Sequence, residues 1–235
     1  MSAGSPSLAH EDTRTMTIEP TLLESFDPDL TARLTSRRGL FTRAASRLGA
    51  AATVPSVLAV ASTEAFAQGL PGQLTQVLNF ALTLEYLEAE FYQTALSRRG
   101  LIPGRYRPVF QQIVRHEVAH VRTLSGALGG AAIAKPQFDF TGRGQYADVF
   151  DNFATFATLS QTFEDLGVAA YKGQAGNLAG TPVLTTALQI HSVEARHAAE
   201  VRRVNRSFGW DGAFDQPKSR SEVLAAAGPF IASGL

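Results

Sequence analysis

The apolar positions of this chain repeat with a helical period from residue 68 onward. They recur at alternating spacings of three and four residues, the period of one face of an α-helix, and no stretch shows the regular alternation expected of a strand. The pattern therefore predicts an all-α domain over residues 68–235. Its four long helices are expected at residues 73–98, 106–128, 146–175 and 181–208.

Residues with strong capping preferences mark several of the expected helix ends. Gly129-Gly130 ends the second helix, because glycine readily adopts the left-handed conformation that follows a helix. Thr181 and Pro182 are expected to open the fourth helix as its N-cap and first residue. The sequence SRSE at residues 219–222 has the spacing of a capping box and predicts a short fifth helix.

The lengths of the links between the helices predict the topology. The links around residues 100–104 and 176–181 are short, so each joins two antiparallel neighbours. The middle link, from residue 129 to about residue 145, is longer and contains a proline and several glycines. This order predicts a four-helix bundle of two antiparallel hairpins joined by one crossover.

Each long helix carries a glutamate on its apolar face: Glu85, Glu117, Glu164 and Glu194. Two helices add a histidine three residues later, at His120 and His197. Residues at i and i+3 project from one side of a helix, so each Glu-x-x-His pair can reach one metal ion or two neighbouring ions. One such pair is common by chance, but two, each following a helix with its own inward glutamate, indicate a shared site.

The two hairpins also resemble each other in sequence. LTLEYLEAEFY in the first helix aligns with QTFEDLGVAAY in the third, and QIVRHEVAH aligns with QIHSVEARH. The alignment pairs Glu85 with Glu164, Tyr92 with Tyr171, Glu117 with Glu194 and His120 with His197. Glu88 pairs with Gly167 and has no counterpart, so we expect it behind the ligands or toward solvent. We expect Tyr92 and Tyr171 to be core aromatics whose hydroxyls find hydrogen-bond partners.

Four carboxylates that converge in an apolar bundle need positive charge to remain ionised. Two divalent cations would balance them and leave the histidines neutral. Mixed oxygen and nitrogen ligation suits two iron or two manganese ions, and leaves zinc open. The alternative is a buried polar network in which Arg115, Arg122 or Arg196 supplies the charge. His116 and His191 lie off the main stripes and are expected at the surface or behind the ligands.

These motifs resemble those of the ferritin-like superfamily of di-iron and di-manganese carboxylate proteins. The resemblance covers most of residues 68–235 and is greatest to exported bacterial ferritin-like domain proteins, which are related to plant desiccation-associated proteins. It implies that Glu85 and Glu164 each bind one metal ion and that Glu117 and Glu194 bridge the two ions. His120 and His197 would each bind one ion.

The resemblance implies a di-metal oxidoreductase acting on O2, peroxide or ferrous iron, in protection against oxidative stress. Ferroxidase-, peroxidase- and catalase-like activities all fit, and the partner would be a small oxidant or a metal ion. The alternatives are a non-catalytic envelope protein for stress or desiccation, and a metal-sequestering protein. The oligomeric state stays open, with a homo-oligomer among the alternatives.

The N-terminal 67 residues have a different composition. Residues 1–36 are polar and lack periodicity, which predicts disorder. Arg37-Arg38 then precedes an apolar run and a small-x-small cleavage pattern at residues 65–67. This stretch resembles a twin-arginine (Tat) signal, although Phe41 stands one position later than the family pattern prefers. The alternative is a short amphipathic helix. We expect the Tat machinery to export the protein to the periplasm or beyond, with membrane anchoring if the signal is retained.

Composition narrows the chemistry further. The chain of 235 residues has a formal net charge of zero, which gives no reason to expect nucleic acid as a partner. It contains no cysteine, so disulfides, thiolate metal sites and a Cys-ligated electron-transfer module are excluded.

Overall fold

The computed structural model describes residues 70–234, and this part of the chain is mostly helical, with very little strand. The all-α prediction is therefore confirmed. The predicted disordered segment, the Tat signal and its cleavage site lie outside the described residues, so the proposed boundary after residue 67 stays a prediction.

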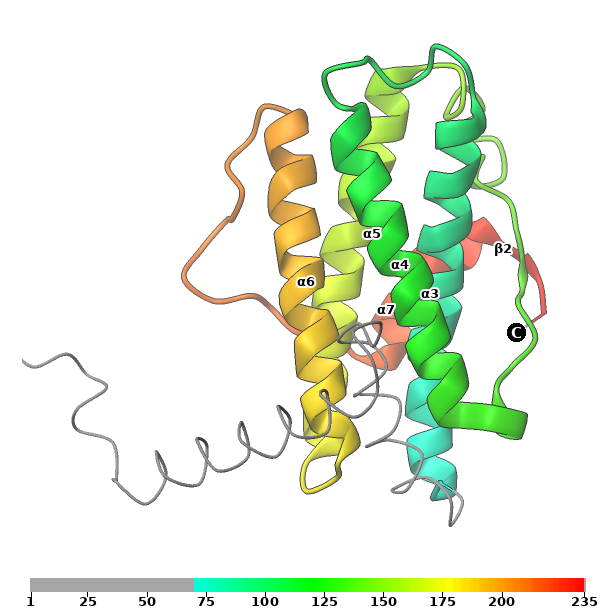
Figure 1. The fold of residues 1–235 in the computed structure, drawn as a ribbon, viewed down its shortest axis with the longest axis vertical. Coiled ribbons are helices and arrows are strands. Elements are labelled where there is room, and N and C mark those ends of the chain that lie inside the picture. The colour runs from blue at the N-terminus through cyan, green and yellow to red at the C-terminus, as the bar shows by residue number, and fades with distance from the viewer. Residues whose placement is uncertain (1–69, 235) are drawn as a thin grey trace, which may run out of the picture. The chain divides into compact units, whose positions relative to one another are not determined.

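Four long helices form the bundle (Figure 1). They are α3 (Gly72–Ser97), α4 (Arg107–Leu128), α5 (Phe153–Gln174) and α6 (Val183–Val204). Helix α3 packs mainly on α4, and α5 packs mainly on α6, so the short links do form two hairpins. The hairpins meet through α3 against α5 and through α4 against α6. The segment between α4 and α5 runs the length of the bundle, as the predicted crossover requires (Figure 1).

Two helix starts differ from the prediction. Helix α5 begins at Phe153 rather than near residue 146, because the side chain of Asn152 caps it by accepting a hydrogen bond from the Ala154 amide at 3.0 Å. The preceding residues form turns. Thr181 does not cap α6: its hydroxyl donates backward to the Leu178 carbonyl at 2.7 Å, and Pro182 is the residue before the helix.

The C-terminal segment reinforces the crossover. The predicted capping box is present at Ser219 and Glu222 and opens helix α7 (Arg220–Ala227). Beyond it, strand β2 (Ile231–Ser233) pairs antiparallel with β1 (Gln137–Phe138) in the crossover. The sequence pattern did not predict this pair, because strands of two and three residues are too short to show a period of two. Three 3-10 turns complete the described elements: η1 (Gly129–Ala131), η2 (Ala175–Leu178) and η3 (Gly228–Phe230).

Two apolar cores fill the bundle on either side of the glutamate layer. One is aromatic and contains the later part of α3 with the first turns of α4 and α5, including Phe91, Phe110, Phe156 and Phe163. The other is aliphatic and contains the first turns of α3 and α6 with the end of α4, including Leu78, Leu124, Ala187 and Ile190. The glutamates and histidines therefore lie between two layers that exclude water.

None of the helices in residues 70–234 combines the length and the apolar character needed to cross a bilayer.

The aromatic core makes a prediction about stability. Phe91 is fully buried and its ring contacts the rings of Tyr92, Phe140, Phe150, Phe156 and Phe163. The substitution Phe91→Ala should lower the free energy of unfolding by about 3–5 kcal/mol, because it leaves a cavity among these rings. Urea unfolding followed by circular dichroism measures the change. Phe208→Ala is the control, since that ring is 83% exposed, and should change stability by less than about 0.5 kcal/mol. Equal effects of the two substitutions would contradict the packing described.

Candidate metal centre

Six side chains from the four long helices meet midway along the bundle. Helix α3 supplies Glu85, α4 supplies Glu117 and His120, α5 supplies Glu164, and α6 supplies Glu194 and His197. All four carboxylates are completely buried, and the two histidines are 8% and 5% exposed. The structure thus brings together every residue that the sequence predicts as a metal ligand.

The donor atoms of these residues form two groups, in each of which all atoms lie within 4.8 Å of one another. One group consists of Glu85, Glu117, His120 and Glu194, and the other of Glu117, Glu164, Glu194 and His197. Glu117 and Glu194 belong to both groups. This is the arrangement of two adjacent ion positions that share two carboxylates, with one further carboxylate and one imidazole at each.

The two histidines face the carboxylates through the same ring nitrogen. The Nδ1 atom of His120 lies 3.1 Å from Glu85, 3.0 Å from Glu194 and 3.3 Å from Glu117. The Nδ1 atom of His197 lies 2.9 Å from Glu117, 3.3 Å from Glu164 and 3.8 Å from Glu194. Each Nδ1 atom is therefore surrounded by three carboxylate oxygens from three different glutamates.

Several of these atoms are buried and make no hydrogen bond of good geometry, although oppositely charged atoms of the site lie at ion-pair distance from them. They are Glu117 Oε1, Glu164 Oε2, both carboxylate oxygens of Glu194, and His197 Nδ1. All five belong to the four residues of the second group. A carboxylate oxygen or imidazole nitrogen buried in this way is stabilised by a bound cation. The donor set of this structure therefore fits a metal ion.

The pKa values of the buried glutamates are set by burial, by their charges on one another and by contact with the two histidines. Burial and the charge of Glu194 raise the pKa of Glu117 well above its ordinary value. Burial likewise raises the pKa of Glu164 to about 7. Burial also opposes ionisation of Glu194, but contact with both histidines outweighs it and lowers the pKa of that carboxyl to about 2.

The pKa values of both histidines are raised as well, which for a histidine favours the charged form. Burial disfavours the imidazolium of His120, but Glu85 and the other carboxylates outweigh it and raise the pKa of His120 to about 12. The pKa of His197 is raised in the same way, against burial, by Glu164 and its neighbours. Two imidazolium ions would only partly balance four carboxylates, whereas two divalent cations would balance them completely.

The polar network with arginine is not what the structure shows. Arg115, Arg122 and Arg196 are all exposed. Arg115 contacts the side chain of Gln112, and Arg196 donates to the Ser192 carbonyl at 2.8 Å, so both lie along their own helices. That alternative is therefore wrong for these arginines.

Two tyrosines connect α3 and α5 by hydrogen bonds across the site. The Tyr92 hydroxyl on α3 donates to Glu164 on α5, and the Tyr171 hydroxyl on α5 donates to Glu85 on α3, both at 2.5 Å. Both tyrosines are core aromatics with hydrogen-bonded hydroxyls, as expected. Burial and the adjacent carboxylate raise the pKa of each phenol, so each keeps its proton as a donor. The tyrosines fix the orientation of the two unshared carboxylates.

Glu88 is buried, with only 2% of its surface exposed, and lies outside both donor groups, so of the two expected places it takes the one behind the ligands. It lies against Gly167 of α5, where an added Cβ would come within 3.3 Å of an oxygen of Glu88 and also of Glu194. Burial and the charge of Glu194 raise the pKa of Glu88 well above its ordinary value. The glycine that faces Glu88 in the sequence repeat therefore leaves room for a fifth buried carboxyl group.

His116 makes a contact that helical periodicity did not predict. Its Nδ1 atom lies 2.8 Å from the outer nitrogen, Nε2, of His197, and its own Nε2 contacts the side chain of Gln112. In residues 70–234, no side chain makes the equivalent contact with His120, because Val193 occupies the position of His116 in the repeat. The sequence signal that could have indicated this contact is a second histidine, one residue before Glu117. His191 is partly buried and lies outside both groups of donor atoms.

Comparison with known families agrees with this architecture. Residues 73–207, more than half of the chain, match the family described as the ferritin-like domain. The chain belongs to that family. A search of curated proteins finds no match.

The raised histidine pKa values predict how the stability of metal-free protein depends on pH. Unfolded histidine titrates near pH 6.5, so between pH 7 and 9 the folded state holds more protons than the unfolded state. The stability of chelator-treated protein should therefore fall as pH rises across this window. Urea unfolding at pH 7, 8 and 9 measures the slope. Stability that stays constant or rises between pH 7 and 9 would contradict the assignment.

The contact between His116 and His197 predicts two unequal metal positions. A partner on the outer nitrogen of a ligating histidine orients the ring, and its loss typically weakens metal binding about 10–100-fold. His116→Ala should therefore weaken one of two Mn(II) binding steps by that factor and leave the other unchanged, as measured by calorimetric titration. His191→Ala, which removes a histidine outside both groups, is the control. Equal weakening of both steps, or of neither, would refute this role.

Proposed function

We propose that the chain holds two iron or manganese ions between its four long helices and uses them for two-electron redox chemistry on O2, peroxide or ferrous iron. The observation that carries the proposal is the convergence of four fully buried carboxylates and two buried imidazoles in two overlapping groups of donor atoms. Membership of the ferritin-like domain family supports it.

The residues present give each ion position a defined set of ligands. Glu85 and His120 would hold one ion, and Glu164 and His197 the other. Glu117 and Glu194 would contact both, since their oxygens belong to both groups. When bound, the ion pair supplies two electrons, enough to reduce dioxygen to peroxide or, with cleavage of the O–O bond and uptake of two protons, peroxide to two waters.

The rest of the bundle would serve this chemistry by holding the ligands in place and keeping bulk water out. The hydroxyls of Tyr92 and Tyr171 donate to one oxygen of Glu164 and of Glu85, respectively, which leaves the other oxygen of each carboxylate for the ion. The apolar cores above and below lower the local polarity, which strengthens every interaction between the ions and the carboxylates. Sustained turnover would draw further electrons from ferrous iron or from a second peroxide.

We also propose that the protein acts outside the cytoplasm, in protection against oxidative stress. The twin arginine at residues 37–38 and the small-x-small pattern at 65–67 support export. A protein that consumes oxidants or oxidises iron would be useful there. Neither activity needs a dedicated electron-transfer module, and a chain without cysteine cannot carry a Cys-ligated one.

Metal content tests the binding part of the proposal. Purified protein reconstituted anaerobically with Fe(II) or Mn(II) should retain about two ions per chain by elemental analysis. The double variant Glu117→Ala/Glu194→Ala should lose both ions, because both residues belong to both donor groups. Glu90→Ala/Glu200→Ala is the control, because these two glutamates of helices α3 and α6 lie outside both groups. Loss of metal in both double variants, or in neither, would contradict the site.

Turnover tests the redox part. Protein loaded with two ions should consume peroxide or oxidise added Fe(II) under air, and the Glu117→Ala/Glu194→Ala variant should not. Two bound ions with no turnover on any of these substrates would overturn the redox proposal and favour metal sequestration or a structural role.

A further inference from the structure

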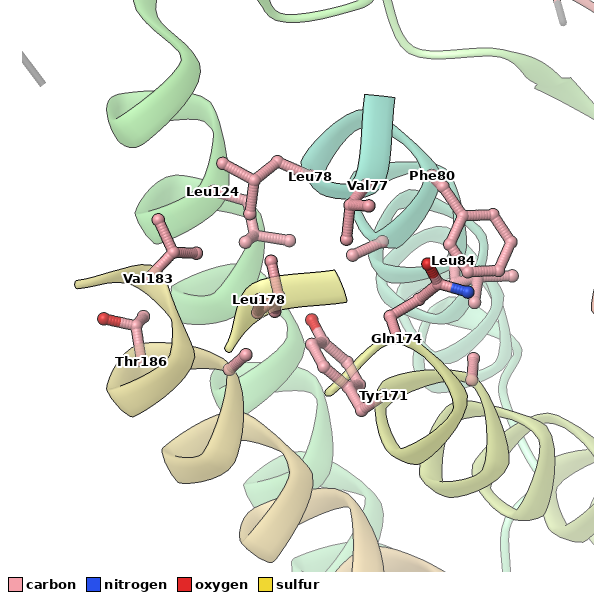
Figure 2. Close-up of a pocket in the computed structure, with 13 residues that line it drawn as sticks. Val77, Leu78, Phe80, Leu84, Leu124, Tyr171, Gln174, Leu178, Val183 and Thr186 are labelled. Carbon is pink, nitrogen blue, oxygen red and sulfur yellow. The ribbon is translucent and has the colours of Figure 1, made fainter. Parts of the chain in front are cut away.

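Figure 2 shows a narrow cavity lined mainly by residues of the aliphatic core. This core lies on the other side of the glutamate layer from the aromatic core. The cavity has a volume of about 20 Å3 and is lined by residues of all four long helices and of η2. Most of its walls are apolar, including Leu78, Ala81, Leu124, Leu178, Val183 and Ala187. The space suits one molecule of two or three atoms, since a water needs about 10–15 Å3.

The polar groups at the cavity are few. The Tyr171 hydroxyl donates to Glu85, and the side-chain oxygen of Gln174 accepts from Asn177 at 2.9 Å, so of these two side chains only the Gln174 amide nitrogen lacks a hydrogen bond within residues 70–234. Thr186 is only partly buried (Figure 2). A water or a peroxide molecule inside the cavity would therefore give up most of its hydrogen bonds, and both are disfavoured there. A small apolar molecule would lose nothing.

The cavity adjoins the candidate metal centre. Ala81 precedes Glu85 by four residues on α3, and Leu124 follows His120 by four residues on α4, so the cavity walls lie about 6 Å along the bundle axis from these two residues. Tyr171 forms the boundary, because its side chain lines the cavity while its hydroxyl contacts Glu85. The cavity thus lies beside the ion position that Glu85 and His120 would hold, with Tyr171 between them.

We propose that this cavity is a binding site for dioxygen, from which the gas reaches the ion position at Glu85 and His120. The inference rests on the proposed function and names O2 as the oxidant that this end of the bundle admits. Dioxygen is apolar and diatomic, so it matches both the volume and the walls of the cavity. Peroxide and metal cations, which must keep polar partners, have to enter the centre by another path.

Xenon binding tests the cavity independently of turnover, because xenon occupies dry apolar cavities of small size. Crystals of the full chain pressurised with xenon should show one xenon atom among Leu78, Ala81, Leu124 and Ala187. Absence of xenon from this position at saturating pressure would overturn the proposal.

The substitution Ala187→Leu tests the route in solution, because it fills the cavity from α6. In metal-loaded protein it should slow oxidation by O2 about tenfold or more, because no space remains for the gas in a close-packed interior. Oxidation by peroxide and the metal content should stay within about twofold of the parent protein. Ala81→Leu fills the same cavity from α3 and should reproduce the result.

The control is Ala157→Leu, the same change at a buried alanine of the aromatic core on the other side of the centre. It should affect the O2 and peroxide rates equally. Equal slowing of both rates by Ala187→Leu, or no slowing of either, would refute the route. If the parent protein binds two ions and one xenon but oxidises nothing, the proposed function fails while the gas site stands, so the two failures are distinguishable.

Discussion

The mutual repulsion of buried carboxylates is the constraint on which the rest of this structure depends. Four glutamates with no exposed surface converge between the helices, and full ionisation would place four negative charges in a medium that stabilises charge poorly. Two histidines, two phenol hydroxyls and the surrounding apolar cores are arranged around this charge. Apolar residues at these positions would stabilise the bundle more than buried glutamates do. The arrangement therefore makes physical sense as a set of ligands for cations.

The two halves of the site are related but not equivalent. The sequence repeat places matching glutamates, histidines and tyrosines on the two hairpins, and the tyrosines exchange partners across the α3–α5 contact. Two departures from the repeat break the symmetry. Glu88 lies where the other hairpin has Gly167, and His116 supports His197 where the other hairpin has Val193. The cavity adds a third difference, since it lies beside the centre on the side of Glu85 and His120.

Helical periodicity was sufficient to predict the bundle and the residues that meet inside it, because a glutamate on an apolar stripe must lie in the core. It could not predict the strand pair, whose members are too short to have a period, or the late start of α5, where one asparagine cap outweighs the helical pattern before it. His116 was placed only at the surface or behind the ligands. Its contact with His197 depends on how α4 faces α6, which spacing within one helix does not specify.

The pairing of β1 with β2 has a consequence for the order in which the protein assembles. Strand β1 lies in the crossover between the hairpins, but its partner follows all four long helices in the chain. During synthesis, the crossover cannot be pinned until α5, α6 and α7 have been made. Each hairpin can form as it emerges from the ribosome, and the two can dock through α3 against α5 and α4 against α6 once α6 has been made. The carboxylates can therefore be brought together before β2 exists to fix the crossover over them.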